Sequence, residues 1–370
     1  MSTSTILAPI AERAAAPDTL RVPTAGGLTW RPAVPGDAPA VLELQNAILS
    51  ADGAPYRYSL DEVVESLDSP NLDAAADTLL GLDGDGVPRA YAAVGLPAGD
   101  TTLVRAYVEG GVHPDRRGDG IGRELLAWQV GRARQRLAAS GKDVPARIMG
   151  FVEDDAPDRV HGLFAHAGFA VMRYYHVLER DLRPGSAPIP DAALEGSLRV
   201  VPFGPELDEP TRLAHNDAFR DHWGSQPQSA EQWRHGRSLL APEWSFAVVD
   251  DAPDVDALLD SPDTDPETAA ALRAGEPFVV GYQMAARYEE DFPVRGYTFG
   301  FTDILGSRRA YRGRGVGVAA LAAGMRAFAA DGMEFACLDV DTANPSGAHG
   351  LYASLGYVKA SGHRMYSIEL

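Results

Sequence analysis

The chain has 370 residues, 45% of them hydrophobic, which is enough to build two domains with their own cores. The formal net charge is −19 at pH 7, which argues against nucleic acid and acidic membranes as partners. A single cysteine, Cys337, rules out an intrachain disulfide, and the apolar strand around it predicts a buried, inert thiol. We expect a cytoplasmic protein, because no apolar run reaches membrane-spanning length and the N-terminus lacks a charged leader segment.

The N-terminal part of the chain is expected to form an arm followed by one domain. Residues 1–27 are rich in Ala, Thr and Pro without a hydrophobic period, which predicts the arm. A strand is predicted at 28–31 and an amphipathic helix at 38–50, whose inward face carries Val41, Leu44 and Ile48. The further elements predicted in this part are a helix at 60–67 and strands at 78–82, 88–94, 102–112 and 170–182.

A glycine-rich loop, Arg117-Gly-Asp-Gly-Ile-Gly122, follows the strand at 102–112 and begins a helix with Ile121, Leu125 and Trp128 on one face. Glycines directly before a helix let a phosphate approach backbone N–H groups, and the helix N-terminus adds positive potential. The loop therefore predicts an anion-binding site. The alternative is a tight strand-to-helix turn without a ligand.

A proline-rich stretch, Arg183-Pro-Gly-Ser-Ala-Pro-Ile-Pro190, opens a predicted interdomain linker at 184–197. The chain then restarts with a strand at 198–201 and a helix at 209–219. Residues 250–267 contain eight acidic residues, three prolines and no Lys or Arg, which predicts a mobile loop. This loop is either a solvated insertion or a lid over an acceptor. Strands are predicted on either side of it, at 244–249 and 277–287.

A second glycine-rich loop, Arg312-Gly-Arg-Gly-Val-Gly317, lies between an apolar strand at 297–305 and an Ala-rich helix. This helix carries Leu321, Met325 and Phe328 on one face. The G-x-G-x-G spacing of both loops differs from the dinucleotide fingerprint, and neither loop has the Lys of a nucleoside-triphosphate loop. The sequence therefore favours a phosphate ligand of another kind.

A second motif follows each glycine loop. Leu351-Tyr-Ala-Ser-Leu-Gly356 follows the second loop, after a strand at 334–341, and Leu163-Phe-Ala-His-Ala-Gly168 follows the first. The two loops are 195 residues apart, and the aromatic positions of the later motifs, Phe164 and Tyr352, are 188 apart. A repeat of about 190 residues is much longer than a solenoid unit, so the sequence predicts two domain-sized copies.

The Arg-led loop, followed by Asn344 and the Leu-Tyr-x-x-Leu-Gly motif, resembles the GNAT superfamily of acyl-CoA-dependent N-acyltransferases. Relative to the family pattern, one extra residue stands between Asn344 and Ala348. The resemblance implies an α+β fold class (α/β mixed sheet) with two GNAT-type domains in tandem, at residues 28–183 and 198–370. Each domain would be a mostly antiparallel splayed sheet flanked by helices. The two-copy order is similar to that of the mycothiol synthase family, but the acidic insertion, the arm and the length depart from it, so its substrate is not carried over.

The resemblance also implies roles for individual residues. Tyr352 would be the general acid that protonates the departing CoA sulfur, and the alternative is a merely packed aromatic. Asp303 is the candidate base for the amine, although strand alternation would equally turn it to solvent. His222 and Trp223 are the candidate acceptor-binding residues, with a packed helix-capping aromatic as the alternative. The residues implied in CoA binding are Leu305 and Ser307 at the acyl end, Arg312, Gly313, Arg314, Gly315, Val316, Gly317 and Asn344 around the pyrophosphate, and Arg117, Gly118, Gly120 and Gly122 in the first copy.

The two copies differ at positions that matter for this chemistry. Phe164 stands at the place of Tyr352 and cannot donate a proton. Asp119 stands at the place of Arg314, and a carboxylate repels a pyrophosphate that a guanidinium attracts. We therefore expect the second copy to be catalytic and the first to be degenerate.

The expected function is that of an enzyme, an N-acetyltransferase that moves an acetyl group from acetyl-CoA to a primary amine of a small molecule. The amine would attack directly in a ternary complex. The alternatives are a mycothiol-synthase-like acetylation and a non-catalytic acyl-CoA-binding module. The spacing of His, Cys and Asp predicts no metal site, and the protein is expected to act as a monomer or a homodimer.

Overall fold

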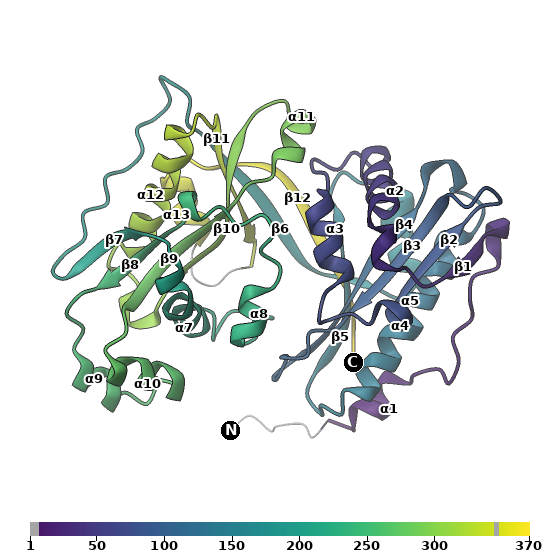
Figure 1. Ribbon diagram of the computed structural model, residues 1–370, viewed down its shortest axis with the longest axis horizontal. Coiled ribbons are helices and arrows are strands. Elements are labelled where there is room, and N and C mark those ends of the chain that lie inside the picture. The colour runs from purple at the N-terminus through teal and green to yellow at the C-terminus, as the bar shows by residue number, and fades with distance from the viewer. Residues whose placement is uncertain (1–6, 344–347) are drawn as a thin grey trace. The chain divides into compact units, whose positions relative to one another are not determined.

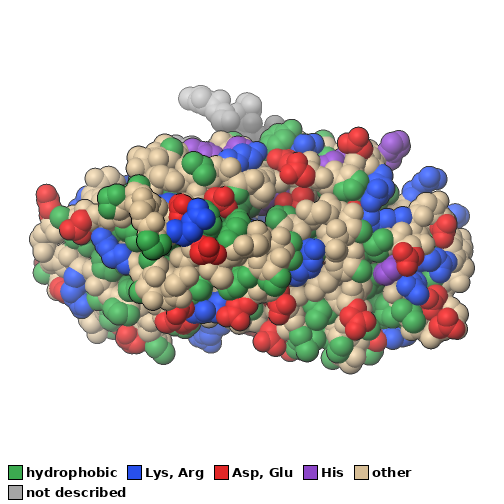
Figure 2. Space-filling model, turned by 90° about the horizontal axis from the view of Figure 1, so that it is seen from above, with side chains coloured by type: hydrophobic (Ala, Val, Ile, Leu, Met, Phe, Trp, Pro, Cys, Tyr) green, Lys and Arg blue, Asp and Glu red, His purple; other side chains and the backbone are tan. Residues whose placement is uncertain are grey.

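The computed structural model describes residues 7–343 and 348–370 (Figure 1). The chain forms two compact units: the first contains the residues up to Tyr175 together with Gly362–Leu370, and the second contains His176–Ser361. Each unit holds a mixed sheet with helices packed on it, which confirms the predicted fold class. On the face shown in Figure 2, the acidic and basic side chains of the described residues lie interspersed. Of the described helices, none is long and apolar enough to cross a membrane.

The first unit is built on a sheet with the strand order β1-β2-β3-β4-β5-β12. Its neighbouring strands run antiparallel except β4 and β5, which are parallel. The predicted inward face of α2 packs on the core: Val41 and Leu44 are buried and Ile48 is half-buried. The helices are α1 (Ile10–Ala14), α2 (Ala38–Ala51), α3 (Leu60–Leu67), α4 (Ala74–Asp77), α5 (Ile121–Ala139) and α6 (Asp158–His166), and the strands are β1 (Thr29–Arg31), β2 (Thr78–Leu82), β3 (Pro88–Gly95), β4 (Val104–Val112) and β5 (Ala146–Glu153).

The second unit repeats this plan with the strand order β6-β11-β10-β9-β8-β7, in which β10 and β11 are parallel. Helices α7 and α12 both pack on β9 and β10. Cys337 lies buried in β11, and burial raises the pKa of its thiol to about 12, as expected for an inert residue. The helices are α7 (Asp208–Ala218), α8 (Ala230–Arg234), α9 (Val255–Asp260), α10 (Pro266–Ala274), α11 (Phe292–Arg295), α12 (Val316–Ala330) and α13 (Ala348–Ser354), and the strands are β7 (Leu198–Pro202), β8 (Phe246–Asp250), β9 (Phe278–Ala286), β10 (Phe299–Ser307) and β11 (Phe335–Asp341).

Helix α12, which follows the second glycine loop, packs unusually close to its sheet. Glycine makes this approach possible, because a Cβ at Gly281 would overlap Val316 and a Cβ at Gly300 would overlap the ring of Phe328. The predicted apolar face of the helix is confirmed, since its Leu, Met and Phe side chains are fully buried. The close packing fixes where the helix begins relative to β10, and hence where the glycine loop lies.

Two strands divide between the units. Strand β6 (Ala170–Asp181) begins in the first unit and ends in the second, whereas β12 (Val358–Glu369) begins in the second and ends in the first. The end of β12 pairs antiparallel with β5, from His363 opposite Glu153 to Glu369 opposite Arg147. The compact units are therefore a different division of the chain from the sequence repeat. The boundaries at 28–183 and 198–370 stay a prediction about that repeat.

The acidic segment at 250–267 is ordered, and the prediction of a mobile loop was wrong. It forms α9 and the start of α10, which lie side by side beyond β8 and β9 (Figure 1). Two of its carboxylates cap these helices: Asp254 accepts a hydrogen bond from Ala257 N at 3.1 Å, and Asp265 accepts one from Thr268 N at 2.9 Å. The apolar residues between them pack against the core of the unit. The acidic composition of this segment suggested a solvated loop, because composition alone does not distinguish a carboxylate that caps a helix from one that is only exposed to water.

The predicted arm and the predicted linker are both held against a helix. In the first unit, Ile10 is buried near α5, and the Glu124 carboxylate in the first turn of α5 accepts a hydrogen bond from Ala25 N at 2.9 Å. In the second unit, Arg326 of α12 donates a hydrogen bond to Pro190 O at 2.8 Å. Each segment thus runs along the helix that follows a glycine loop.

Candidate active site

The sheet of each unit opens at the same place. Strand β10 pairs with β11 only as far as Thr302 opposite Leu338, while its pairing with β9 continues to Ser307 opposite Gly281. In the first unit β4 leaves β5 after Tyr107 and stays paired with β3. The backbone of β10 beyond Thr302 therefore faces a gap between two diverging strands, as the family resemblance implied.

The second glycine loop turns sharply between β10 and α12. Gly313 and Gly315 have φ values of 75° and 76°, which side-chain-bearing residues rarely adopt. Gly315 is the N-cap of α12 and offers no side chain to its first N–H groups. Nothing lies within 4 Å of a Cβ built at Gly313, so the backbone there is open to an approaching group. The loop can hold an anion against the N-terminus of α12.

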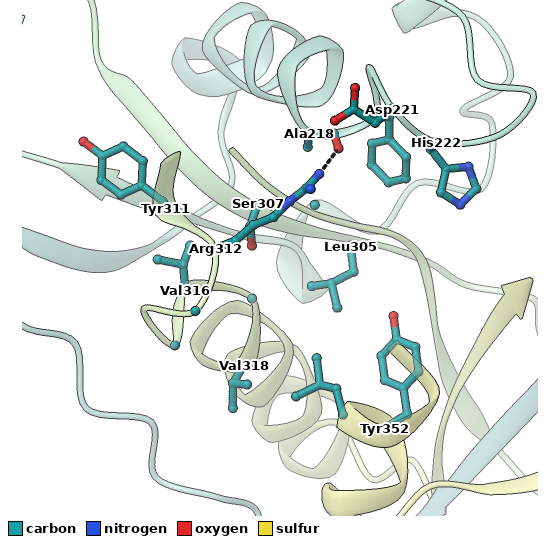
Figure 3. A pocket seen from close by; sticks show the side chains of 16 residues that line it. Ala218, Asp221, His222, Leu305, Ser307, Tyr311, Arg312, Val316, Val318 and Tyr352 are labelled. Carbon is teal, nitrogen blue, oxygen red and sulfur yellow. Dashed lines mark hydrogen bonds between the residues drawn. The ribbon is translucent and has the colours of Figure 1, made fainter. Parts of the chain in front are cut away.

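A cavity of about 680 Å³ joins this loop to the diverging strands (Figure 3). It brings together most of the residues predicted from the second copy, including Tyr352, the loop glycines, Leu305, Ser307 and His222. The cavity is lined by Ala218, Phe219, Asp221, His222, Leu305, Gly306, Ser307, Tyr311, Arg312, Gly313, Gly315, Val316, Gly317, Val318, Leu351 and Tyr352.

Three predicted site residues that the structure describes are not among those that line the cavity. Arg314 stacks on the ring of Tyr311, with 4.7 Å from its guanidinium carbon to the ring centroid. Asp303 is exposed and accepts a hydrogen bond from the Tyr288 hydroxyl at 3.0 Å. Trp223 is half-buried beside the cavity residue His222. Asn344 lies outside the described residues. The roles proposed for these four residues stay predictions.

Tyr352 presents its hydroxyl to the cavity from α13 (Figure 3). The residue is 8% exposed, and burial raises the pKa of its hydroxyl to about 12. The group is therefore a neutral O–H donor at ordinary pH, which a general acid must be. Its ring packs edge-on to Tyr357 at 5.9 Å between centroids, which holds it in place.

Arg312 is the loop arginine that reaches the cavity. Its Nη2 donates a hydrogen bond to Ala218 O, at the end of α7, at 2.6 Å (Figure 3). A neutral carbonyl partner positions the guanidinium without neutralising its charge. The remaining N–H groups of Arg312 stay available for an anion.

Sequence reasoning missed a carboxylate on β11. Asp339 follows Leu338, the last residue of β11 paired with β10, so it stands where the two strands begin to diverge. Asp339 is exposed and is not among the residues that line the cavity. Desolvation by its surroundings and the like charge of Asp341 nevertheless raise the pKa of its carboxyl to about 7. The alternating Leu-Asp-Val-Asp pattern of this strand was the signal that could have found it.

The first unit has the same loop but a different electrostatic arrangement. A cavity of about 340 Å³ adjoins its loop, with Phe164 in the lining at the place of Tyr352. Arg117 donates two hydrogen bonds to the carboxylate of Asp52, at 2.6 and 2.9 Å. Glu124 places a second carboxylate in the first turn of α5, where it bonds backbone N–H groups of the arm. The positive groups of this loop are already neutralised by the protein itself.

The described residues hold no group of three or more His, Cys, Asp or Glu that could bind a metal ion. The site instead joins a phosphate-sized cradle, two diverging strands and a neutral tyrosine hydroxyl.

Comparisons with known proteins agree with this geometry. The model of the acetyltransferase (GNAT) family matches residues 230–357. A mycothiol acetyltransferase of Salinispora arenicola (strain CNS-205) is 30% identical over 356 residues, which cover 95% of this chain and 97% of the relative. A protein of the same name from Thermobispora bispora is 29% identical over 345 residues, covering 90% of this chain and 96% of the relative.

Solved structures show the same fold. A GCN5-related N-acetyltransferase from Sphaerobacter thermophilus has a TM-score of 0.64 and 23% identity, covering 95% of this chain and 97% of that one. A tandem GNAT protein from the clavulanic acid biosynthesis pathway has a TM-score of 0.61 and 15% identity, covering 92% of this chain and 98% of that one. The chain therefore belongs to the GNAT acetyltransferase family and is an acyltransferase with a tandem architecture.

Proposed function

We propose that the second unit transfers an acetyl group from acetyl-CoA to a primary amine of a small molecule. One observation carries this proposal: the glycine loop, the diverging strand β10 and the Tyr352 hydroxyl all open on a single cavity of about 680 Å³. The loop supplies an anion cradle, the strand supplies backbone groups, and the tyrosine supplies a proton. Acyl transfer from a CoA thioester needs these three parts together.

The residues around the cavity fit CoA as a co-substrate. The open backbone at Gly313, the uncapped N-terminus of α12 and the Arg312 guanidinium suit a pyrophosphate. Leu305 and Ser307 lie on the part of β10 that has left β11, where an extended chain of amides can pair with free backbone groups. Leu351 and Val318 add apolar lining beside them.

The reaction balances with two residues of this chain. The amine nitrogen attacks the thioester carbon, a C–N bond forms and the C–S bond breaks. The proton lost by the amine passes to the Asp339 carboxylate, directly or through a water molecule, and the departing sulfur takes the proton of the Tyr352 hydroxyl. Asp339 suits the role of base because its pKa of about 7 lets it accept a proton near neutral pH. Asp303, on the facing strand, is the alternative base.

The names of the relatives suggest which acceptor to try first. Two relatives that cover most of this chain are named mycothiol acetyltransferase, so a mycothiol-related amine is the first acceptor that we propose. His222 and Asp221 line the cavity on the α7 side and would contact such an acceptor.

A thiol-release assay with acetyl-CoA and a panel of amines tests the proposal. We expect release of CoA that depends on both the amine and the protein, with the mass of the product raised by one acetyl group. A protein that binds acetyl-CoA in calorimetry but releases no thiol with any amine in the panel would instead be an acyl-CoA-binding module.

A further inference from the structure

A second cavity of about 430 Å³ adjoins the first in the second unit and is not used by the acyl transfer. It lies between the β10–α12 loop and the acidic insertion, since residues of both line it. Tyr311 and Arg312 line both cavities. A ligand in the second cavity would therefore touch the same loop that holds the phosphates of the co-substrate.

The feature that sets this cavity apart is Arg308, whose side chain is buried with only 5% of the residue exposed. Its Nε donates a hydrogen bond to Val279 O at 2.7 Å, and its guanidinium lies 4.6 Å from the ring centroid of Phe278. Within the described part of the chain, its two Nη atoms have no hydrogen-bond or ion-pair partner. A buried cation without a direct counter-charge is costly unless a ligand supplies one.

Two nearby carboxylates, Asp217 and Asp265, attract Arg308 electrostatically, but neither forms an ion pair with it. Arg220 and Arg309 also line the cavity, and they already pair with acids: Arg220 with Asp217 at 2.7 Å, and Arg309 with Asp221 at 3.0 Å. Asp265 is engaged as the cap of α10. Four arginines and three aspartates line the cavity, so it carries a net positive charge in a chain whose formal charge is −19.

We propose that this cavity binds a phosphate monoester, with the two free Nη groups of Arg308 as its principal contacts. A guanidinium presents two parallel N–H donors that match two phosphate oxygens, and a dianion compensates a buried cation fully. The hydroxyl of Ser261 in the lining adds a further hydrogen-bond donor, since it only accepts a bond from Asp263 N. The phosphate comes either from the 3′ position of CoA bound next door or from a separate phosphorylated molecule. Only the first source rests on the proposed function.

The first experiment uses inorganic phosphate and the full chain without CoA. Phosphate should bind the wild type in calorimetry and raise its melting temperature, and Arg308→Met should weaken that binding by at least about 10-fold. Arg273→Met is the matched control, because Arg273 is exposed on α10 and does not line the cavity. If Arg308→Met does not fold, Arg308→Lys is used instead. Lysine keeps the positive charge but lacks the two parallel N–H donors of the guanidinium, so phosphate binding should still weaken. Equal phosphate affinity in the wild type and the folded Arg308 variant overturns the proposal.

A second experiment separates the two sources by comparing CoA with dephospho-CoA. If the 3′-phosphate occupies the cavity, the wild type prefers CoA, Arg308→Met removes that preference, and inorganic phosphate competes with CoA. If a separate phosphate is the ligand, the preference is the same in both proteins and phosphate binds together with CoA. If the wild type binds inorganic phosphate but does not bind CoA, the proposed function is contradicted and the phosphate site is still supported.

Discussion

The two units share a pair of asparagine-to-backbone hydrogen bonds, and these show which residues of the two units are equivalent. Asn46 exchanges two hydrogen bonds with the backbone of Tyr58, and Asn216 does the same with the backbone of Gln228, in each case across 12 residues. In both units a serine capping box follows directly, and it begins the next helix. These matching clamps show that the end of α2 and the end of α7 are equivalent parts of the repeat.

This register places Asp52 and His222 at equivalent positions, each six residues after its clamp asparagine. In the first unit the Asp52 carboxylate accepts two hydrogen bonds from the loop arginine, Arg117. In the second unit the equivalent Arg312 turns to a backbone carbonyl, and His222 lines the cavity instead. One side chain at the end of the first helix thus decides whether the loop arginine is neutralised or left for a ligand. The two units therefore share the same fold around the loop and differ in whether its arginine is neutralised, and this difference assigns the ligand to the second unit.

The other differences point the same way. The first turn of α5 carries Glu124, whereas the first turn of α12 has no acidic residue. Phe164 packs edge-on against Phe169 at 5.1 Å, where the second unit presents the Tyr352 hydroxyl to its cavity. We therefore expect catalysis in the second unit alone, and four predictions test this division.

The largest effect is expected from Tyr352→Phe. Removing the proton donor should lower kcat by roughly 10²–10⁴-fold with little change in the affinity for acetyl-CoA. Steady-state kinetics with calorimetry on the same protein measures both quantities. The matched control is Phe164→Tyr in the first unit, which should leave kcat at the wild-type value. Wild-type turnover in Tyr352→Phe, with the chemical step rate-limiting, would show that this tyrosine only packs.

The next effect concerns Asp339 and pH. A base must be deprotonated, so kcat/KM should fall as the pH falls through about 7, and Asp339→Asn should lower the rate above pH 7 and remove this limb. The free energy of unfolding should change with pH in the opposite direction to kcat/KM. Because folding raises this pKa, the carboxyl favours the folded state when protonated and loses that contribution as the pH rises through about 7. The variant should therefore gain stability relative to the wild type at high pH.

Asp303→Asn serves as the comparison for that experiment, since Asp303 lies on the neighbouring strand β10 and, like Asp339, is not among the residues that line the cavity. We expect the Asp303→Asn variant to keep the fall in kcat/KM as the pH drops through about 7. If Asp303→Asn loses the limb and Asp339→Asn keeps it, the two carboxylates have been assigned the wrong way round.

A smaller effect is expected from copying the first unit's charge balance into the second. His222→Asp would put a carboxylate into the cavity that Arg312 lines, at the position equivalent to Asp52, which pairs with Arg117. The KM for acetyl-CoA should rise about 10-fold, equivalent to about 1.4 kcal/mol, with kcat changed less. His222→Asn is the control for the lost ring. An equal rise in both variants would mean that the histidine itself matters, and that charge at this position does not.

The smallest effect is expected from blocking the first loop. Gly120→Trp fills the turn before α5, and because the first unit is not catalytic, kcat and KM should stay near their wild-type values as long as the protein folds. Titration should give one CoA per chain for the wild type and for this variant. Circular dichroism checks the fold. A folded Gly120→Trp protein without activity would place an essential site in the first unit.

Much of the candidate site was visible in the sequence because it depends on local patterns. Two glycines in the left-handed region before a helix, and an apolar face repeating along that helix, are properties of a few neighbouring residues. The loop cradle and the tyrosine, both named from the sequence, line one cavity, and the roles assigned to them stay predictions. The sequence did not distinguish Arg312 from Arg314, because which arginine reaches the cavity depends on the carbonyl of Ala218, nearly a hundred residues away.

The sequence by itself determined the tandem, the two loops, the faces of the main helices and the loss of the proton donor at Phe164, because each follows from residue type and short-range spacing. Only the tertiary structure decided that the end of β12 completes the first sheet, that the acidic insertion is helical and that Arg117 is neutralised by Asp52. It also decided that Arg308 is buried and lines a second cavity. These features depend on contacts between residues far apart in the chain, and burial and charge compensation arise only when such residues meet.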